Sequence, residues 1–184
     1  MARQLTISRQ KVRGAKKHLR DVLAMPSSVD GFFPDPEQHS PRPFWDYKLQ
    51  IPQSFVEGHW ATTKTKRLCM VALLQTCAVL RSQKPTDTFA TVVASISVPS
   101  MFSSRVTVFF DHDYYRDFFN RTGPYQIWSP LPKNRSLASE WRLPVEPELR
   151  LPELGYRETI KSDEDEDLEY TGEIWFYGDI DFQN

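Results

Sequence analysis

The chain has 184 residues, of which 40% are hydrophobic and 13% aromatic, enough to bury a core without disulfides or metals and too many for an intrinsically disordered protein. We expect one domain over residues 1–184. The net charge of −1 is unevenly spread, because residues 1–144 carry 20 basic and 11 acidic side chains and residues 145–184 carry 3 and 13. The apolar runs are too short for a membrane-spanning helix or a signal peptide, so we expect a cytoplasmic protein without membrane association.

The two cysteines, Cys69 and Cys77, both belong to the most apolar segment of the chain. If they share a helix, they stand roughly 12 Å apart along its axis, which is too far for a disulfide. We therefore predict free thiols that are buried in the core rather than nucleophiles. Unpaired cysteines are typical of a reducing compartment, which again favours the cytoplasm.

The N-terminal third contains one predicted helix and one predicted strand. Over residues 6–23, apolar side chains recur at helical spacing, and a basic stripe follows the same period, formed by Arg9, Arg13, Lys16 and Arg20. This pattern predicts an amphipathic helix that ends before Pro26. Six prolines between residues 26 and 56 favour irregular structure, within which the alternation over residues 45–51 predicts a strand.

The middle of the chain predicts a helix, two strands and a second helix. Residues 62–82 are apolar around most of the helical circumference, which indicates a central buried helix that includes Leu73. Alternation over residues 88–98 predicts the clearest strand, and residues 105–110 predict another. A short aromatic helix follows, with Asp111 or Asp113 as its capping residue.

The C-terminal part predicts extended structure throughout. Residues 127–131 and 137–143 are weaker extended candidates between prolines, and residues 156–161 and 172–180 predict a hairpin. The segment that joins the two hairpin strands, Asp163 to Glu169, is called the acidic connection below. Together the elements predict an α+β fold in which an antiparallel or mixed sheet packs against a central buried helix and an N-terminal amphipathic helix.

Sequence motifs for catalysis or metal binding are absent. The seven glycines never cluster as a phosphate-binding loop requires, and no Gly-x-Ser-x-Gly elbow occurs. The histidines and cysteines are scattered, so we expect neither a metal nor a cofactor. The best local candidate for an enzyme site is the run Asp111, His112 and Asp113, in which a carboxylate would orient an imidazole. A capping aspartate before a helix explains the same residues.

Two charged surfaces suggest binding functions. The basic stripe would neutralise nucleic-acid phosphates without reading bases, or it simply keeps the helix solvated. The acidic connection is flanked by Tyr170, and acidic residues beside aromatic anchors suit an interface with a basic protein. The expected contact residues are Asp163, Glu164, Asp165, Glu166, Trp175 and Tyr177. A solvated hairpin loop accounts for the same charges.

Six segments of the chain, KVRGAKKHLRDV, FWDYKLQIPQSF, RLCMVALLQ, IWSPL, GYRETI and GEIWFYGDI, together resemble a bacterial domain-of-unknown-function family of small cytosolic proteins. The resemblance spans most of the chain. It implies a bacterial source and brings no activity, cofactor or catalytic residue.

Three functional hypotheses therefore remain. We favour a protein–protein interaction module, for which an immunity or inhibitor protein against a basic toxin is one candidate. The first alternative is a nucleic-acid-binding accessory protein that uses the basic stripe. The second is an enzyme around Asp111, His112 and Asp113, which would have to line a concave pocket. Because no local signature supports catalysis, we expect a non-enzymatic protein rather than an enzyme.

Overall fold

The computed structural model describes residues 44–48, 63–98, 104–120, 126–143, 146–161 and 169–180. Three sequence-based predictions lie outside these residues. They are the N-terminal helix over residues 6–23, the end of the first predicted strand at residues 49–51, and residues 163–168 of the acidic connection.

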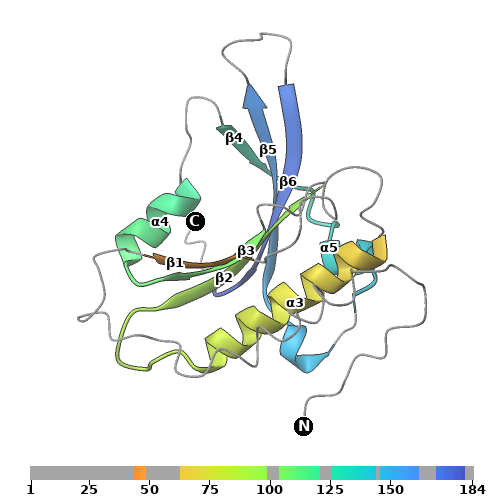
Figure 1. The fold of residues 1–184 in the computed structure, drawn as a ribbon. Coiled ribbons are helices and arrows are strands. Elements are labelled where there is room, and N and C mark those ends of the chain that lie inside the picture. The colour runs from red at the N-terminus through yellow and green to blue at the C-terminus, as the bar shows by residue number, and fades with distance from the viewer. Residues whose placement is uncertain are drawn as a thin grey trace.

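The described residues form one six-stranded antiparallel sheet with the order β1-β3-β2-β6-β5-β4. The strands are β1 (Phe44–Lys48), β2 (Thr91–Val98), β3 (Arg105–Phe109), β4 (Gln126–Pro130), β5 (Glu153–Lys161) and β6 (Glu169–Gly178). The helices are α3 (Thr63–Ser82), α4 (His112–Asn120) and α5 (Leu137–Glu140), with a 3₁₀ turn, η3, at Pro147–Leu149. The α+β fold with an antiparallel sheet is thereby confirmed. Figure 1 shows α3 on one side of the twisted sheet and α4 on the other.

Helix α3 is the central buried helix that the sequence predicts. Its side chains from Cys69 to Leu74 are at most 4% exposed, and Cys77 and Leu80 are fully buried. They pack on alternate residues of the sheet, including Ile96, Val108 and Trp175. A helix that is apolar over most of its circumference needs cover on more than one side, and Leu137, Leu143 and Leu149 from the α5–η3 region belong to the same core cluster.

The opposite face of the sheet carries an aromatic core beneath α4. Phe109 and Phe176 are 1% exposed, and Tyr115 of α4 is 6% exposed. The ring of Phe119 meets Phe176 at 5.0 Å between centroids and Tyr115 at 5.1 Å, both edge to face. Edge-to-face contacts stabilise aromatic pairs beyond the area they bury. The sheet is therefore buried on both faces where these helices cover it.

The predicted extended segment at residues 137–143 is wrong. Residues 137–140 form the helical turn α5, because the Ser136 side chain accepts a hydrogen bond from the Ser139 N–H and the Glu153 carboxylate accepts one from the Leu137 N–H. These two acceptors satisfy amide groups that a short helix leaves open. The turn ends at Arg142, which adopts a left-handed conformation with φ of 49°.

Other boundaries differ by a few residues. The strand predicted from residue 88 begins at Thr91, since residues 86–88 form a bend. The strand predicted to end at residue 180 ends at Gly178, where φ is +125°. Both hairpin strands begin earlier than predicted, β5 at Glu153 and β6 at Glu169. They pair from Glu153↔Tyr177 to Lys161↔Glu169. Among the described residues, no helix is both long and apolar enough to cross a membrane.

Candidate functional site

The β5–β6 hairpin contains the two longest strands of the sheet, at 9 and 10 residues. Their ends at Lys161 and Glu169 extend beyond α3 and α4 (Figure 1). The intervening sequence, residues 162–168, contains five consecutive acidic residues from Asp163 to Asp167. The chain thus attaches its densest charge to the end of a long hairpin.

An ion-pair network fixes the base of this hairpin. Arg135 pairs with both carboxylate oxygens of Glu140 at 2.7 and 2.8 Å and with Glu173 of β6 at 2.5 Å. Its guanidinium also lies 5.7 Å from the ring centroid of Trp175. The hydrogen bonds to Glu140 and then Glu173 raise the pKa of Arg135, and the Arg135 hydrogen bond lowers the pKa of Glu140. A planar guanidinium suits such two-sided pairing, so the hairpin base is tied to α5.

Two of the predicted contact residues are core residues instead. Trp175 is 1% exposed and Tyr177 is 2% exposed, and both point toward α3 in the core cluster. Burial, and then the nearby Glu153 carboxylate, raise the pKa of Tyr177. The prediction that Trp175 and Tyr177 are surface anchors is therefore wrong, because alternation along β6 directs these odd-numbered side chains inward. The other four predicted contact residues, Asp163 to Glu166, lie outside the described residues.

Aromatic side chains are present on the opposite face of the same strands. Trp128 of β4 stacks on Phe176 with ring centroids 5.7 Å apart and planes 13° apart. Tyr156 of β5 meets Trp128 edge to face at 5.9 Å and Phe176 at 6.2 Å. We call Trp128, Tyr156 and Phe176 the aromatic shelf. Glu158 pairs with Trp128 across the strands and lies on the same face, and burial raises its pKa.

The run Asp111, His112 and Asp113 opens α4. The Asp111 carboxylate accepts a hydrogen bond from the Tyr114 N–H at 2.6 Å, which is helix capping. Asp113 pairs with Arg116 one turn later at 3.2 Å, and the side chains of His112 and Asp113 are 64% and 78% exposed. His112 meets the ring of Phe89 edge to face at 5.3 Å. Asp111 thus caps the start of a helix, and the enzyme hypothesis for this run stays a prediction.

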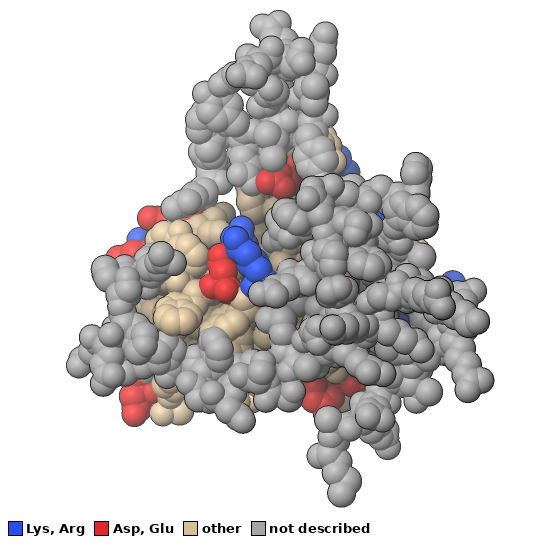
Figure 2. Space-filling view, in the orientation of Figure 1, with Lys and Arg blue, Asp and Glu red and all other residues tan. Residues whose placement is uncertain are grey.

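The described surface has no single charge sign on the face shown in Figure 2. Basic and acidic side chains are interspersed there among uncharged ones. Among the described residues, Arg105 pairs with Asp46 at 2.9 Å, and Asp46 also accepts a hydrogen bond from Thr107 at 2.7 Å. The basic stripe of Arg9, Arg13, Lys16 and Arg20 lies outside the described residues, so its role in nucleic-acid binding stays a prediction.

The cysteines are buried and unpaired, as predicted. Burial raises the pKa of the Cys69 thiol to about 11 and that of the Cys77 thiol to about 12. Neither thiol is a reactive thiolate at neutral pH. Within the described ranges, no group of three His, Cys, Asp or Glu side chains is arranged to hold a metal ion.

Comparison with known proteins identifies the family. A family model described as "Protein of unknown function (DUF3916)" matches residues 25–179. The chain belongs to this family. No curated protein and no solved structure matches it. Membership of DUF3916 confirms the resemblance to a domain-of-unknown-function family, and it assigns no activity.

Sequence reasoning missed the aromatic shelf of this DUF3916 chain. The sequence predicted a strand over residues 156–161, but only the structure shows that Trp128 and Phe176 stack across it. One indication of it was present in the sequence: Tyr156 and Glu158 are two residues apart in a predicted strand, so their side chains lie on the same face. Contacts between strands that are separated by a third strand have no local sequence signature.

Proposed function

We propose that this chain is a protein-binding module of the bacterial cytoplasm whose partner is a basic protein. The acidic connection at the end of the β5–β6 hairpin makes the first contact. In its narrower form, the proposal is that the chain is an immunity or inhibitor protein that covers a basic toxin. The unpaired buried cysteines fit a reducing compartment.

The hairpin is the observation that carries the proposal. Strands β5 and β6 extend past the helices, and the sequence between them holds five acidic residues in succession. Charges at the end of an extended element attract an oppositely charged partner and speed the encounter. The Arg135 network anchors the base of the hairpin to α5, so the strands present their end from a fixed support.

The aromatic shelf supplies a second contact of suitable chemistry. Trp128 and Tyr156 are partly buried and adjoin Glu158 on the same face of β4 and β5. Aromatic rings beside a carboxylate favour lysine or arginine side chains through cation–π and ionic attraction. A basic partner that meets the acidic connection would therefore find favourable groups along the hairpin as well.

The test compares partner capture by three versions of the tagged chain. The first is native, and the second carries Asp163→Asn, Glu164→Gln, Asp165→Asn, Glu166→Gln and Asp167→Asn. The third is a charge-matched control with Asp87→Asn, Asp113→Asn, Asp117→Asn, Glu146→Gln and Glu148→Gln, which neutralises five exposed acids elsewhere on the molecule. Bound proteins are identified by mass spectrometry after capture from a lysate of the source bacterium. Thermal melts check that all three versions fold.

The expected result is one basic protein held in stoichiometric amounts by the native chain and the control, and lost from the hairpin variant. Binding of the purified partner should then weaken as salt rises, because exposed charges are screened. Equal capture by the native chain and the hairpin variant would overturn the proposal. If the partner is a nuclease whose activity is blocked only by the native chain and the control, the inhibitor version is supported.

A further inference from the structure

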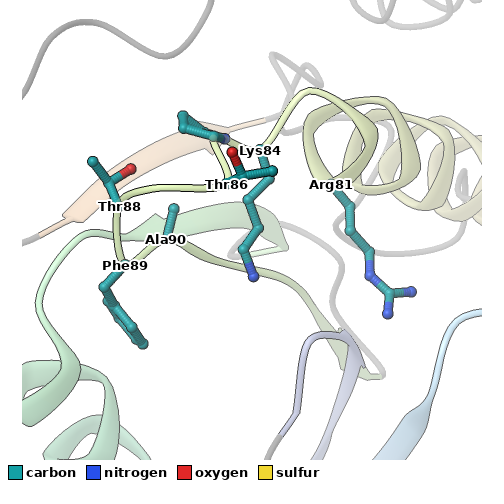
Figure 3. A pocket seen from close by; sticks show the side chains of 7 residues that line it. Arg81, Lys84, Thr86, Thr88, Phe89 and Ala90 are labelled. Carbon is teal, nitrogen blue, oxygen red and sulfur yellow. The ribbon is translucent and has the colours of Figure 1, made fainter.

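A surface pocket with a volume of about 420 Å³ lies where α3 leads into β2. We call it the Arg81 pocket. Arg81 in the last turn of α3 lines it, together with Lys84, Pro85, Thr86, Thr88, Phe89 and Ala90. Figure 3 shows Arg81, Lys84 and Phe89 extending to the same side of the connection. Small-molecule sites typically enclose roughly 300–1,000 Å³, so a small ligand fits.

The pocket presents positive charge outward over a recessed carboxylate. Asp179 pairs with Arg81 Nε at 2.5 Å and with Lys84 Nζ at 3.5 Å. Its side chain is 18% exposed, whereas those of Arg81 and Lys84 are 40% and 36% exposed. Two cations share one carboxylate, and an arriving ligand meets the cations first. Arg81 pairs with Asp179 through Nε, and its guanidinium carries further N–H donors at Nη1 and Nη2.

The backbone at Asp179 is held in place by contacts with β2 and α4 and by the turn at the end of β6. Its N–H donates to the carbonyl of Val92 in β2 at 3.0 Å, and its own carbonyl accepts from the Tyr115 hydroxyl of α4 at 2.9 Å. Gly178 before it adopts a φ of +125°, which turns the chain out of β6. Since the backbone that carries the Asp179 carboxylate is fixed in this way, the two cations that pair with it are oriented before any ligand arrives, and binding loses less conformational freedom.

A flat apolar side chain stands beside these cations. Phe89 is 39% exposed and is the large hydrophobic side chain that the described surface leaves exposed. His112 supports its ring edge to face at 5.3 Å, and Tyr115 lies at 6.3 Å. The ion pairs of Asp179 stabilise the fold, since they tie α3 to the end of β6. That structural role does not explain why the Phe89 ring is exposed beside them.

We propose that the Arg81 pocket binds a small molecule in which an oxyanion is attached to a flat ring. The oxyanion contacts Arg81 and Lys84, and the ring packs against Phe89. Thr88 contributes its hydroxyl, while Thr86 already donates to Asp87 at 3.2 Å. Asp87 is the remaining charged side chain of the connection and is exposed outside the pocket lining. A phosphate and a carboxylate share this chemistry, and the test distinguishes them.

The test is an amide-detected NMR titration of the full chain with four probes. Adenosine 5′-monophosphate and adenosine 5′-carboxylic acid combine the same ring with a phosphate and with a carboxylate, whereas adenosine lacks the anion and inorganic phosphate lacks the ring. We expect saturable shifts at the amides of residues 84 to 90, apart from proline, with one or both combined probes. Adenosine and phosphate should bind at least about tenfold more weakly, because each loses one contact. Preference between the two combined probes assigns phosphate or carboxylate.

Variants locate the binding. Lys84→Gln and Phe89→Ser should each weaken the better probe about tenfold, and both change exposed side chains, so the fold is retained. Lys133→Gln is the matched control, an exposed lysine beyond β4. The proposal is overturned if no probe shifts these amides, or if adenosine or phosphate alone binds as tightly as both combined probes. It is also overturned if Lys133→Gln weakens binding as much as Lys84→Gln.

Discussion

Gly155 of β5 lies opposite Trp175 of β6, and the indole of Trp175 occupies the space beside the glycine where a side chain would stand. A Cβ atom at Gly155 would lie 2.8 Å from Cε3 and Cζ3 of Trp175 and 2.8 Å from Cδ1 of Leu131. Contacts this short do not occur between real side chains. The glycine therefore permits the largest buried side chain of the sheet to lie flat across its neighbouring strand.

Replacement of Gly155 by valine should destabilise the chain by about 1–3 kcal/mol, because Trp175 and Leu131 would have to move within a packed core. The measurement is the midpoint of urea unfolding. Ser129→Ala on neighbouring β4 is the control, since Ser129 is exposed and such changes alter stability by less than about 0.5 kcal/mol. A Gly155→Val midpoint equal to that of the native chain would show that the Trp175 packing is incorrect.

Replacement of Gly178 by alanine should destabilise the chain more than Gly155→Ala does. At Gly178 the φ of +125° is one that side chains rarely adopt, and a Cβ would collide with the backbone carbonyl of Val92. A backbone carbonyl in β2 cannot rotate away as a side chain can. Urea midpoints of the two alanine variants provide the comparison, and the opposite ranking would contradict the assigned backbone conformation at Gly178.

Replacement of Leu73 by aspartate should prevent folding. Leu73 is fully buried in α3, and an unpaired carboxylate there costs several kcal/mol, a large share of the roughly 5–15 kcal/mol that stabilises a domain. Circular dichroism and dispersion of the NMR amide signals measure the loss. Thr63→Asp at the exposed start of the same helix is the control, and it should leave stability unchanged or slightly higher, since acids favour helix N-termini. A folded Leu73→Asp chain would contradict the core assignment.

The thiols of Cys69 and Cys77 should resist labelling until the chain unfolds. Both are buried and their pKa values are raised to about 11 and about 12, so thiolate is scarce at pH 8. With a chromogenic disulfide reagent at pH 8, we expect no rapid reaction in the native state and two thiols per chain in guanidinium. One thiol that reacts rapidly in the native chain would contradict the burial of that cysteine.

The sequence predicted those elements whose pattern is local. Helix α3 and strand β2 have strong periodicity, and Asp111 has the capping position that its type favours. The helical turn after Ser136 was not predictable in this way, because Glu153, 16 residues further along the chain, accepts the Leu137 amide hydrogen bond. Likewise, the inward direction of Trp175 depends on which face of β6 meets α3, and a period of two alone does not choose between faces. The aromatic shelf is assembled from three separate strands. Residues 81–90 alone line the Arg81 pocket, but Asp179, which pairs with its two cations, is distant in sequence.

The ion pair between Arg135 and Glu140 should make stability depend on pH. Hydrogen bonding from Arg135 holds the pKa of Glu140 below its usual value of 4.5 in the folded chain. The ionised carboxylate is therefore favoured by folding, and its contribution is complete above pH 4.5 and is lost as pH falls through the lowered value. We expect the native chain to exceed Glu140→Gln in urea midpoint at pH 7, with a difference that shrinks as the pH falls below 4.5.

Glu158 provides a comparison of opposite sign. Burial raises its pKa above 4.5, so the ionised form is disfavoured by folding and its penalty is present at neutral pH and relieved as the pH falls through the raised value. The stability of Glu158→Gln relative to the native chain should therefore be greatest at pH 7 and decrease in acid. Glu148→Gln is the control for loss of a surface carboxylate, because Glu148 is exposed on the η3 turn. If Glu140→Gln and Glu158→Gln shift the urea midpoint in the same direction with pH, then Arg135 does not bind Glu140 as the structure has it.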